Sequence, residues 1–229
     1  RLSDVRSAQR LLVLVSDWPG AGGSGQLVWF VNTHLHHVQS DEGRAMRHTQ
    51  ATTLLEWMEA ADASTSEDGT GARVVAHHTI IVGDFNSPPE EPAYAAFVKA
   101  GYTSAFAAVS RKAGAGSPGE GDPDDPVRWE PPHTFPTGLV ADTMDTEPPV
   151  TTDYVWFRTH LEAWPRDAAA DASGDSTDAA PAPRLVLDAT AVRLVCNTPH
   201  PLDSTMYPSD HMGLMAELSL VPSPVSAPA

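Results

Sequence analysis

The strongest indication of the fold is the segment Thr79-Ile80-Ile81-Val82-Gly83-Asp84-Phe85-Asn86-Ser87-Pro88-Pro89. It opens with a short apolar run that is typical of a buried strand, and Gly83 ends the run at a polar turn. Beyond the two prolines, Tyr94 and Phe97 stand at helical spacing until Gly101, a residue type that commonly ends a helix. A strand, a polar turn and a helix in this order favour a mixed α/β domain.

The sequence on either side continues the alternation between strands and helices. One amphipathic helix is predicted from residue 43 to about residue 60, with Arg47 on its polar face. Apolar runs predict further strands at 11–15, 26–31, 153–157, 184–196 and 212–220, the first two antiparallel. Residues 111–132 and 162–183 are rich in Ala, Asp, Gly and Pro, which predicts loop insertions in a domain over 1–220, followed by a flexible tail at 221–229.

Composition restricts the classes of function. The chain has 229 residues, 41% of them hydrophobic, which suits one globular unit. Its net charge of −16 predicts a surface that repels nucleic acid and anionic membranes. A polyanionic substrate would therefore need a local positive charge, such as a metal ion. The single cysteine, Cys196, excludes intrachain disulfides and a cysteine-based zinc cluster, and we expect it to be a buried apolar thiol.

The sequence carries no signal for a membrane. No apolar run approaches the roughly 20 residues that span a bilayer. The first residues, beginning at Arg1, do not resemble a signal sequence. The cytoplasm is therefore the default expectation for location.

Polar side chains gather at the ends of four predicted strands. An Asp or Asn in such a place is usually a turn former or a helix cap, and a lone His is usually a surface or core residue. Together, however, they supply the groups needed for metal-assisted hydrolysis of a phosphate ester. The residues are His34, Asp84, Asn86, Asp153, Asp210 and His211.

Each residue type has a use in that reaction. One Asp could orient or deprotonate water, while an Asn or a protonated His donates to the phosphate oxygens. A second Asp paired with the His would raise the pKa of that His and fix its orientation. A remaining Asp could hold Mg²⁺ through oxygen, the ligand type that this ion prefers.

In order, spacing and strand context, these pieces resemble the endonuclease/exonuclease/phosphatase superfamily, which is DNase I-like. The pieces are Thr33-His34-Leu35, Gly83-Asp84-Phe85-Asn86-Ser87, Asp153-Tyr154-Val155-Trp156 and Ser209-Asp210-His211. With Tyr207-Pro208 before the last of them, the sequence looks most like the branch of deadenylases and nocturnin-like phosphatases. The resemblance implies a four-layer αββα sandwich, here its C-terminal part, with the site at the top of two facing sheets.

The resemblance also implies a role for each site residue. Asp84 would be the base that activates water, and Asn86 and His34 would contact the phosphate. His211, oriented by Asp153, would stabilise charge in the transition state. Asp210 would lie beside Mg²⁺, with Mn²⁺ as an alternative, and His133 and Phe135 would line the substrate pocket. The expected substrate is a phosphorylated small molecule, a nucleotide or a single-stranded nucleic acid.

One departure from the family pattern concerns the start of the chain. Family members carry a strand-end Asn and a metal-binding Glu in an N-terminal half that precedes the Thr-His-Leu strand. Here that strand begins near residue 26, and Asp4 and Asp17 stand in no matching context. We therefore expect the complete protein to contain an N-terminal half that this chain lacks.

Two other interpretations remain open. Because residues 34 and 36 share one face of a strand, His34, His36 and His37 could form a zinc hydrolase site, although no Asp-His pair follows them to complete it. Alternatively, the chain is a truncated, catalytically inactive family member that serves as a binding module.

Overall fold

The structure is a computed structural model, and it describes residues 8–16, 25–63, 76–114, 125–135, 148–160, 185–196 and 209–223. The helices are α1 (Asp41–Ala63), α2 (Pro92–Lys99), α3 (Ala105–Ala113) and the 3₁₀ helix η1 (Pro126–Trp129). The strands are β1 (Ala8–Val15), β2 (Gln26–His34), β3 (His78–Asp84), β4 (Thr103–Ser104), β5 (Asp153–Thr159), β6 (Leu185–Val195) and β7 (Gly213–Pro222).

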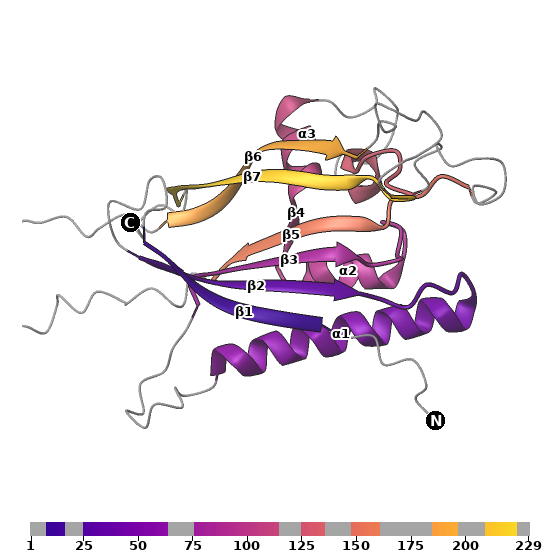
Figure 1. Ribbon diagram of the computed structural model, residues 1–229, viewed down its shortest axis with the longest axis horizontal. Helices are drawn as coiled ribbons and strands as arrows, with labels where there is room; N and C mark the ends of the chain where they lie inside the picture. The colour runs from indigo at the N-terminus through magenta and orange to yellow at the C-terminus, as the bar shows by residue number, and fades with distance from the viewer. Residues whose placement is uncertain are drawn as a thin grey trace, which may run out of the picture.

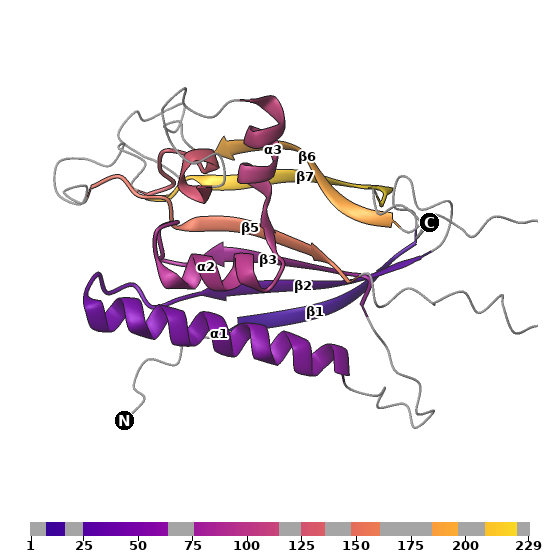
Figure 2. The same ribbon diagram turned by 180° about the vertical axis from the view of Figure 1, so that it is seen from behind.

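Two sheets lie face to face. The larger has five strands in the order β1-β2-β3-β5-β4, and the smaller is the antiparallel pair β6-β7. In the larger sheet β2 and β3 are parallel, whereas β1 and β5 run antiparallel to their neighbours. Helices α1 and α2 lie on one side of this sheet and the β6-β7 pair on the other, as both views show (Figures 1 and 2). The mixed α/β class is confirmed, and the described residues supply three of the four expected layers.

The apolar run of β3 is buried on both faces of the sheet. Ile81 belongs to the core beneath α1 and α2, together with Phe85, Phe97 and Trp156. Ile80 belongs to the core between the two sheets. Because successive side chains of a strand point to opposite faces, a strand between two cores needs apolar residues without alternation.

The inner face of the larger sheet is covered only in part. Leu11 is paired with Phe30, and Phe30 with Ile80, so all three lie in one row across the sheet. Ile80 is 6% exposed beneath the second sheet, whereas Leu11 is 64% and Phe30 40% exposed. These two line a cavity of about 780 Å³ with Asn32 and Val82. The β6-β7 pair thus leaves apolar surface of β1 and β2 open.

Several expectations from the sequence need correction. The loop predicted at 111–132 begins inside α3, which continues to Ala113, and it contains η1. Cys196 is exposed and lies directly after the end of β6, where its φ is 62°. The predicted tail begins inside β7, which ends at Pro222. Residues 115–124, the whole of the predicted loop at 162–183, and 224–229 lie outside the described residues.

Among the residues described, no helix has the length and apolar character needed to cross a bilayer.

Candidate active site

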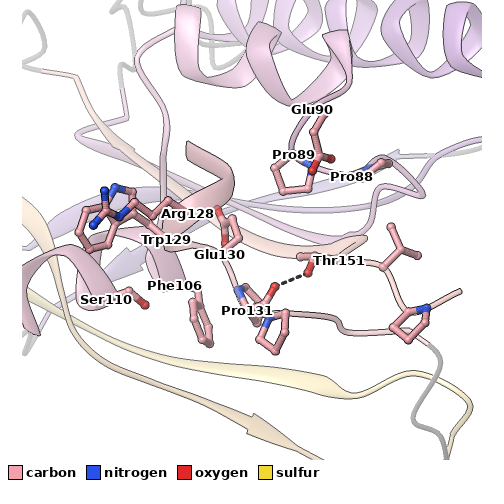
Figure 3. Close-up of a pocket in the computed structure, with 13 residues that line it drawn as sticks. Pro88, Pro89, Glu90, Phe106, Ser110, Arg128, Trp129, Glu130, Pro131 and Thr151 are labelled. Carbon is pink, nitrogen blue, oxygen red and sulfur yellow. Dashed lines mark hydrogen bonds between the residues drawn. The ribbon is translucent and has the colours of Figure 1, made fainter. Parts of the chain in front are cut away.

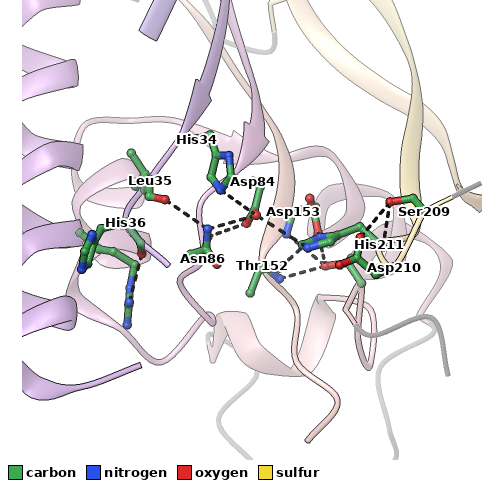
Figure 4. A network of polar contacts seen from close by, with 12 residues as sticks. His34, Leu35, His36, Asp84, Asn86, Thr152, Asp153, Ser209, Asp210 and His211 are labelled. Atoms are coloured by element: carbon green, nitrogen blue, oxygen red, sulfur yellow. Dashed lines mark hydrogen bonds and ion pairs between the residues drawn. The ribbon is translucent and has the colours of Figure 1, made fainter. Parts of the chain in front are cut away.

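Three of the expected site residues lie side by side on neighbouring strands. His34 at the end of β2 is paired with Asp84 at the end of β3, and Asp84 is paired with Asp153 at the start of β5. Neighbouring strands lie roughly 4.8 Å apart, so this register sets the side chains in a row at one edge of the sheet. Figure 4 shows the row, with His211 approaching from the segment that leads into β7.

The turn after β3 fixes the carboxylate of Asp84. Asn86 has a φ of 50°, a conformation that Asn tolerates better than most residues. Its backbone N–H donates to Asp84 Oδ1 at 2.8 Å, and its side-chain Nδ2 donates to Asp84 Oδ2 at 3.1 Å. Nδ2 also donates to the Leu35 carbonyl at 3.2 Å, which ties the turn to the end of β2.

A second group of hydrogen bonds holds Asp153 and His211. The Nδ1 of His211 lies 2.9 Å from Asp153 Oδ2, and since a carboxylate only accepts, Nδ1 is the donor. The same Oδ2 accepts from Thr134 Oγ1 at 2.7 Å and from Thr152 Oγ1 at 3.2 Å. This pairing directs the other ring nitrogen of His211 towards Asp84.

Asp84 stands between two imidazoles. Its Oδ2 lies 3.4 Å from His34 Nε2 and 3.8 Å from His211 Nε2. The second distance exceeds that of a hydrogen bond, so His211 Nε2 has no bond to Asp84 and can donate to another oxygen. His34 is about half exposed, whereas Asp84 and Asp153 are largely buried.

These surroundings shift two ionisation equilibria. Burial raises the pKa of Asp84, and the neighbouring Asp153 carboxylate raises it further, against the opposing effects of the Asn86 N–H, His211 and His34. The hydrogen bond to Asp153 raises the pKa of His211 and outweighs the effect of burial. The site therefore favours a proton on His211 and makes Asp84 more basic than an exposed carboxylate.

Three side chains of the site lie close enough together to hold one metal ion. One ligand atom each from Asp84, Asp153 and His211 lies within 4.8 Å of the others. Asp153 Oδ2 is already committed to three hydrogen bonds. Among the described residues Asp210 is not part of this close group; its carboxylate is exposed and accepts a hydrogen bond from Ser209 Oγ at 3.4 Å. The two carboxylates of the group offer oxygen ligands of the type that hard divalent cations take.

The three neighbouring histidines of the zinc alternative do not form such a group. Within the part of the chain that the structure describes, His34, His36 and His37 are not a close set of three ligands. The rings of His36 and His37 lie 5.6 Å apart, and the backbone N–H of His36 donates to Gln50.

The two expected pocket residues differ in their placement. The ring of Phe135 lies 4.7 Å from that of His211, so it borders the site. His133 makes no hydrogen bond to the site residues within the described ranges. Between them, Thr134 contacts Asp153 directly, a role that the sequence analysis did not assign. The sequence gives little indication of this contact, because Thr134 and Asp153 lie 19 positions apart.

A separate cavity of about 620 Å³ adjoins this network (Figure 3). None of the site residues lines it. It borders the site through Pro88 and Thr151, each two positions from a site residue, and Thr151 donates to the Pro131 carbonyl at 2.6 Å. Its other walls include Trp129, Phe106 and several prolines.

Comparisons with known proteins agree with this picture. The profile of the Endonuclease/Exonuclease/phosphatase family matches residues 5–211. Among solved structures, the human Nocturnin catalytic domain with bound sulfate anion has a TM-score of 0.52 and 20% identity, over 94% of this chain and 53% of that one. TDP2 from D. rerio, complexed with single-strand DNA product, has a TM-score of 0.49 and 16% identity, over 93% and 62%.

A third similar structure is an endonuclease/exonuclease/phosphatase family protein from Bacteroides thetaiotaomicron, with a TM-score of 0.47 and 16% identity, over 86% of this chain and 50% of that one. The chain thus spans roughly half to three fifths of these structures. No curated protein matches the sequence significantly.

Proposed function

Because the chain belongs to the endonuclease/exonuclease/phosphatase family, whose fold is that of phosphoester hydrolases, we propose that it carries the water-activating half of such a site. The observation that carries the proposal is the row His34, Asp84 and Asp153, completed by His211. Carboxylate, amide and imidazole groups from distant parts of the sequence lie there within reach of one substrate.

Asp84 is the general base. Its carboxylate is fixed by two hydrogen bonds from Asn86, and its pKa is raised by burial and by Asp153. It takes a proton from water as the water oxygen bonds to phosphorus and the ester oxygen leaves. A positioned base contributes about 10²–10⁴-fold to such a step.

His211 and its neighbours stabilise the negative charge that develops on the phosphate. Asp153 orients His211 and favours its protonated form, so that Nε2 donates to a phosphate oxygen. The Nε2 of His34 donates to a second phosphate oxygen. The two hydrogens of Asn86 Nδ2 bond to Asp84 and to the Leu35 carbonyl, so Asn86 contacts the phosphate by transferring the second of these bonds to a phosphate oxygen.

Asp210 would hold Mg²⁺, or Mn²⁺, at the exposed edge of the site. A cation bound there would supply Lewis-acid polarisation of the phosphate and offset its negative charge. This local charge is important because the protein as a whole has a net charge of −16. Phe135, packed on His211, lines the substrate side.

The complete catalytic unit includes further residues that cover the open part of the larger sheet. Leu11 and Phe30 are exposed, although the row to which they belong continues beneath the second sheet. An N-terminal half would pack on these two residues and supply the metal-binding Glu. The substrate is a phosphorylated small molecule, a nucleotide or a single-stranded nucleic acid. A small substrate suffers less repulsion from the acidic surface than a long polyanion.

The test compares the full-length protein and the present chain on oligonucleotides, nucleotides and a generic phosphodiester in Mg²⁺. We expect turnover by the full-length protein and little by the chain alone. Asp84→Asn should lower kcat by about 10²–10⁴-fold or more. Asp41→Asn, an equivalent change at the exposed start of α1, is the control. Undiminished activity of Asp84→Asn would contradict the proposal that Asp84 is the general base. Equal activity of the two proteins would contradict the proposal that catalysis needs an N-terminal half.

A further inference from the structure

Arg47 is buried against the loops that carry the site, although the sequence pattern places it on the polar face of its helix. Its side chain is 1% exposed. Nε and Nη2 donate to the two carboxylate oxygens of Glu91 at 2.8 and 2.6 Å. A two-point ion pair of this kind fixes direction as well as distance.

The remaining donors of Arg47 hold the segment that follows β2. Nη1 donates to the carbonyls of His36 at 3.3 Å and Val38 at 2.8 Å, and Nη2 donates to the side-chain oxygen of Gln39 at 3.3 Å. From the next turn of α1, Gln50 accepts the backbone N–H of His36 at 2.9 Å. Helix α1 thus fixes the 36–39 segment from beneath.

Both chain segments that Arg47 contacts, the one after β2 and the one before α2, lead directly to Asn86. The Leu35 carbonyl accepts from Asn86 Nδ2, and Gln39 Nε2 donates to the Asn86 carbonyl at 3.3 Å. Glu91 is five residues beyond Asn86 on the same loop, and its N–H is bonded to the Pro88 carbonyl. The guanidinium therefore joins the two chain segments between which Asn86 is held in its left-handed conformation.

We propose that the buried Arg47–Glu91 pair, assisted by Gln50, positions Asn86 for the phosphate. The inference rests on the proposed function for its effect on rate. The three residues are positioning residues, since none of them is among the groups proposed to contact substrate. A displacement of about 1 Å of a substrate-contacting group can lower the rate about 10²-fold, so the effect is measurable.

The decisive variant replaces both charges with apolar residues, Arg47→Met with Glu91→Leu, in the full-length protein. Replacing a buried ion pair by well-packed apolar side chains commonly preserves stability, whereas removing one partner does not. We expect an unfolding temperature near that of the parent, a kcat about 10- to 100-fold lower, and a smaller change in KM. Arg47→Lys, which keeps the charge but loses the fork of donors, should not restore kcat.

A second readout does not depend on activity. The side-chain amide signals of Asn86 in a ¹H–¹⁵N correlation spectrum report its hydrogen bonds to Asp84 and Leu35, and they should shift in the double variant. If the parent has no phosphoesterase activity, the proposed function fails, and the Asn86 signals alone decide this inference. A folded double variant with parental kcat and parental Asn86 signals would overturn it.

Two further variants complete the experiment. If the double variant does not fold, Gln50→Leu, which removes only the acceptor for His36, takes its place. It should shift the Asn86 signals and lower kcat by a smaller factor, and parental values for both would overturn the inference. Lys112→Met breaks the ion pair between α3 and β6, away from both loops, and should leave kcat and the Asn86 signals unchanged.

Discussion

Asp153 is held in place by one buried hydroxyl group. Thr134 is 0% exposed, and its Oγ1 donates to Asp153 Oδ2 while accepting the N–H groups of Thr152 at 2.9 Å and Asp153 at 3.1 Å. One donor and two acceptor sites are all that a hydroxyl has, so every one is used. The orientation of His211 depends on this residue through Asp153.

Thr134→Val should therefore affect both stability and rate. The change keeps the shape but leaves two buried N–H groups without their acceptor, which costs about 1–3 kcal/mol in the free energy of unfolding. If the proposed function holds, kcat should fall about tenfold or more, because Asp153 is no longer fixed. Denaturant unfolding and steady-state kinetics measure the two effects. Thr134→Ser keeps the hydroxyl and should recover most of the rate; a valine variant with parental kcat would contradict the role.

At the scale of single elements, the end of β3 passes very close to β2. Gly83 has a φ of 140°, and a Cβ at this position would lie 1.8 Å from the carbonyl oxygen of Thr33. Such a contact is impossible without moving one of the two strands. The approach brings Asp84 level with His34.

Gly83→Ala should separate the two strands at the site. We expect a loss of about 3 kcal/mol or more in unfolding free energy, from the clash and the backbone strain together. Gly114→Ala is the matched control, because its φ is also positive, at 63°, but nothing lies within 4 Å of the added carbon. That change should cost about 1 kcal/mol. Equal losses in thermal or denaturant unfolding would show that the contact with Thr33 is not the cause.

The elements that the sequence predicted are those with a strong local signal. The apolar run and turn at 79–89, followed by a helix, are present as β3 and α2, and the antiparallel pairing of the first two strands is confirmed. Helix α3 was not predicted, since its nine residues offer only a cap at Ser104 and a left-handed Gly114 as signals. Arg47 and Thr134 could not be identified because their roles depend on partners 44 and 19 residues away.

At the scale of the whole molecule, stability should depend on pH through the opposite end of the sheet. Burial lowers the pKa of His78 to about 3, with further contributions from His77 and His160. In the unfolded chain this imidazole has its ordinary pKa of 6.5, so it binds a proton at a pH at which the folded chain does not. Stability from this group is therefore complete above pH 6.5 and is lost as the pH falls towards 3.

His78→Gln should reduce this acid sensitivity. One pKa unit corresponds to about 1.4 kcal/mol. Between pH 6.5 and pH 3 the parent therefore loses up to about 4–5 kcal/mol of unfolding free energy from this group. Burial raises the pKa of Glu130 to about 7, which acts in the opposite direction. Both proteins share Glu130, so the difference between their unfolding free energies at pH 7 and pH 4 isolates His78. A difference that does not change with pH would contradict the assignment.

The alignment of His34, Asp84 and Asp153 across three strands has a consequence for how this chain can vary. A strand presents alternate residues to opposite sides, so inserting or deleting one residue within β2, β3 or β5 would turn one of these three side chains into the helix-facing core. Length changes should accumulate in the connections, while these three segments keep a constant residue count across related genes.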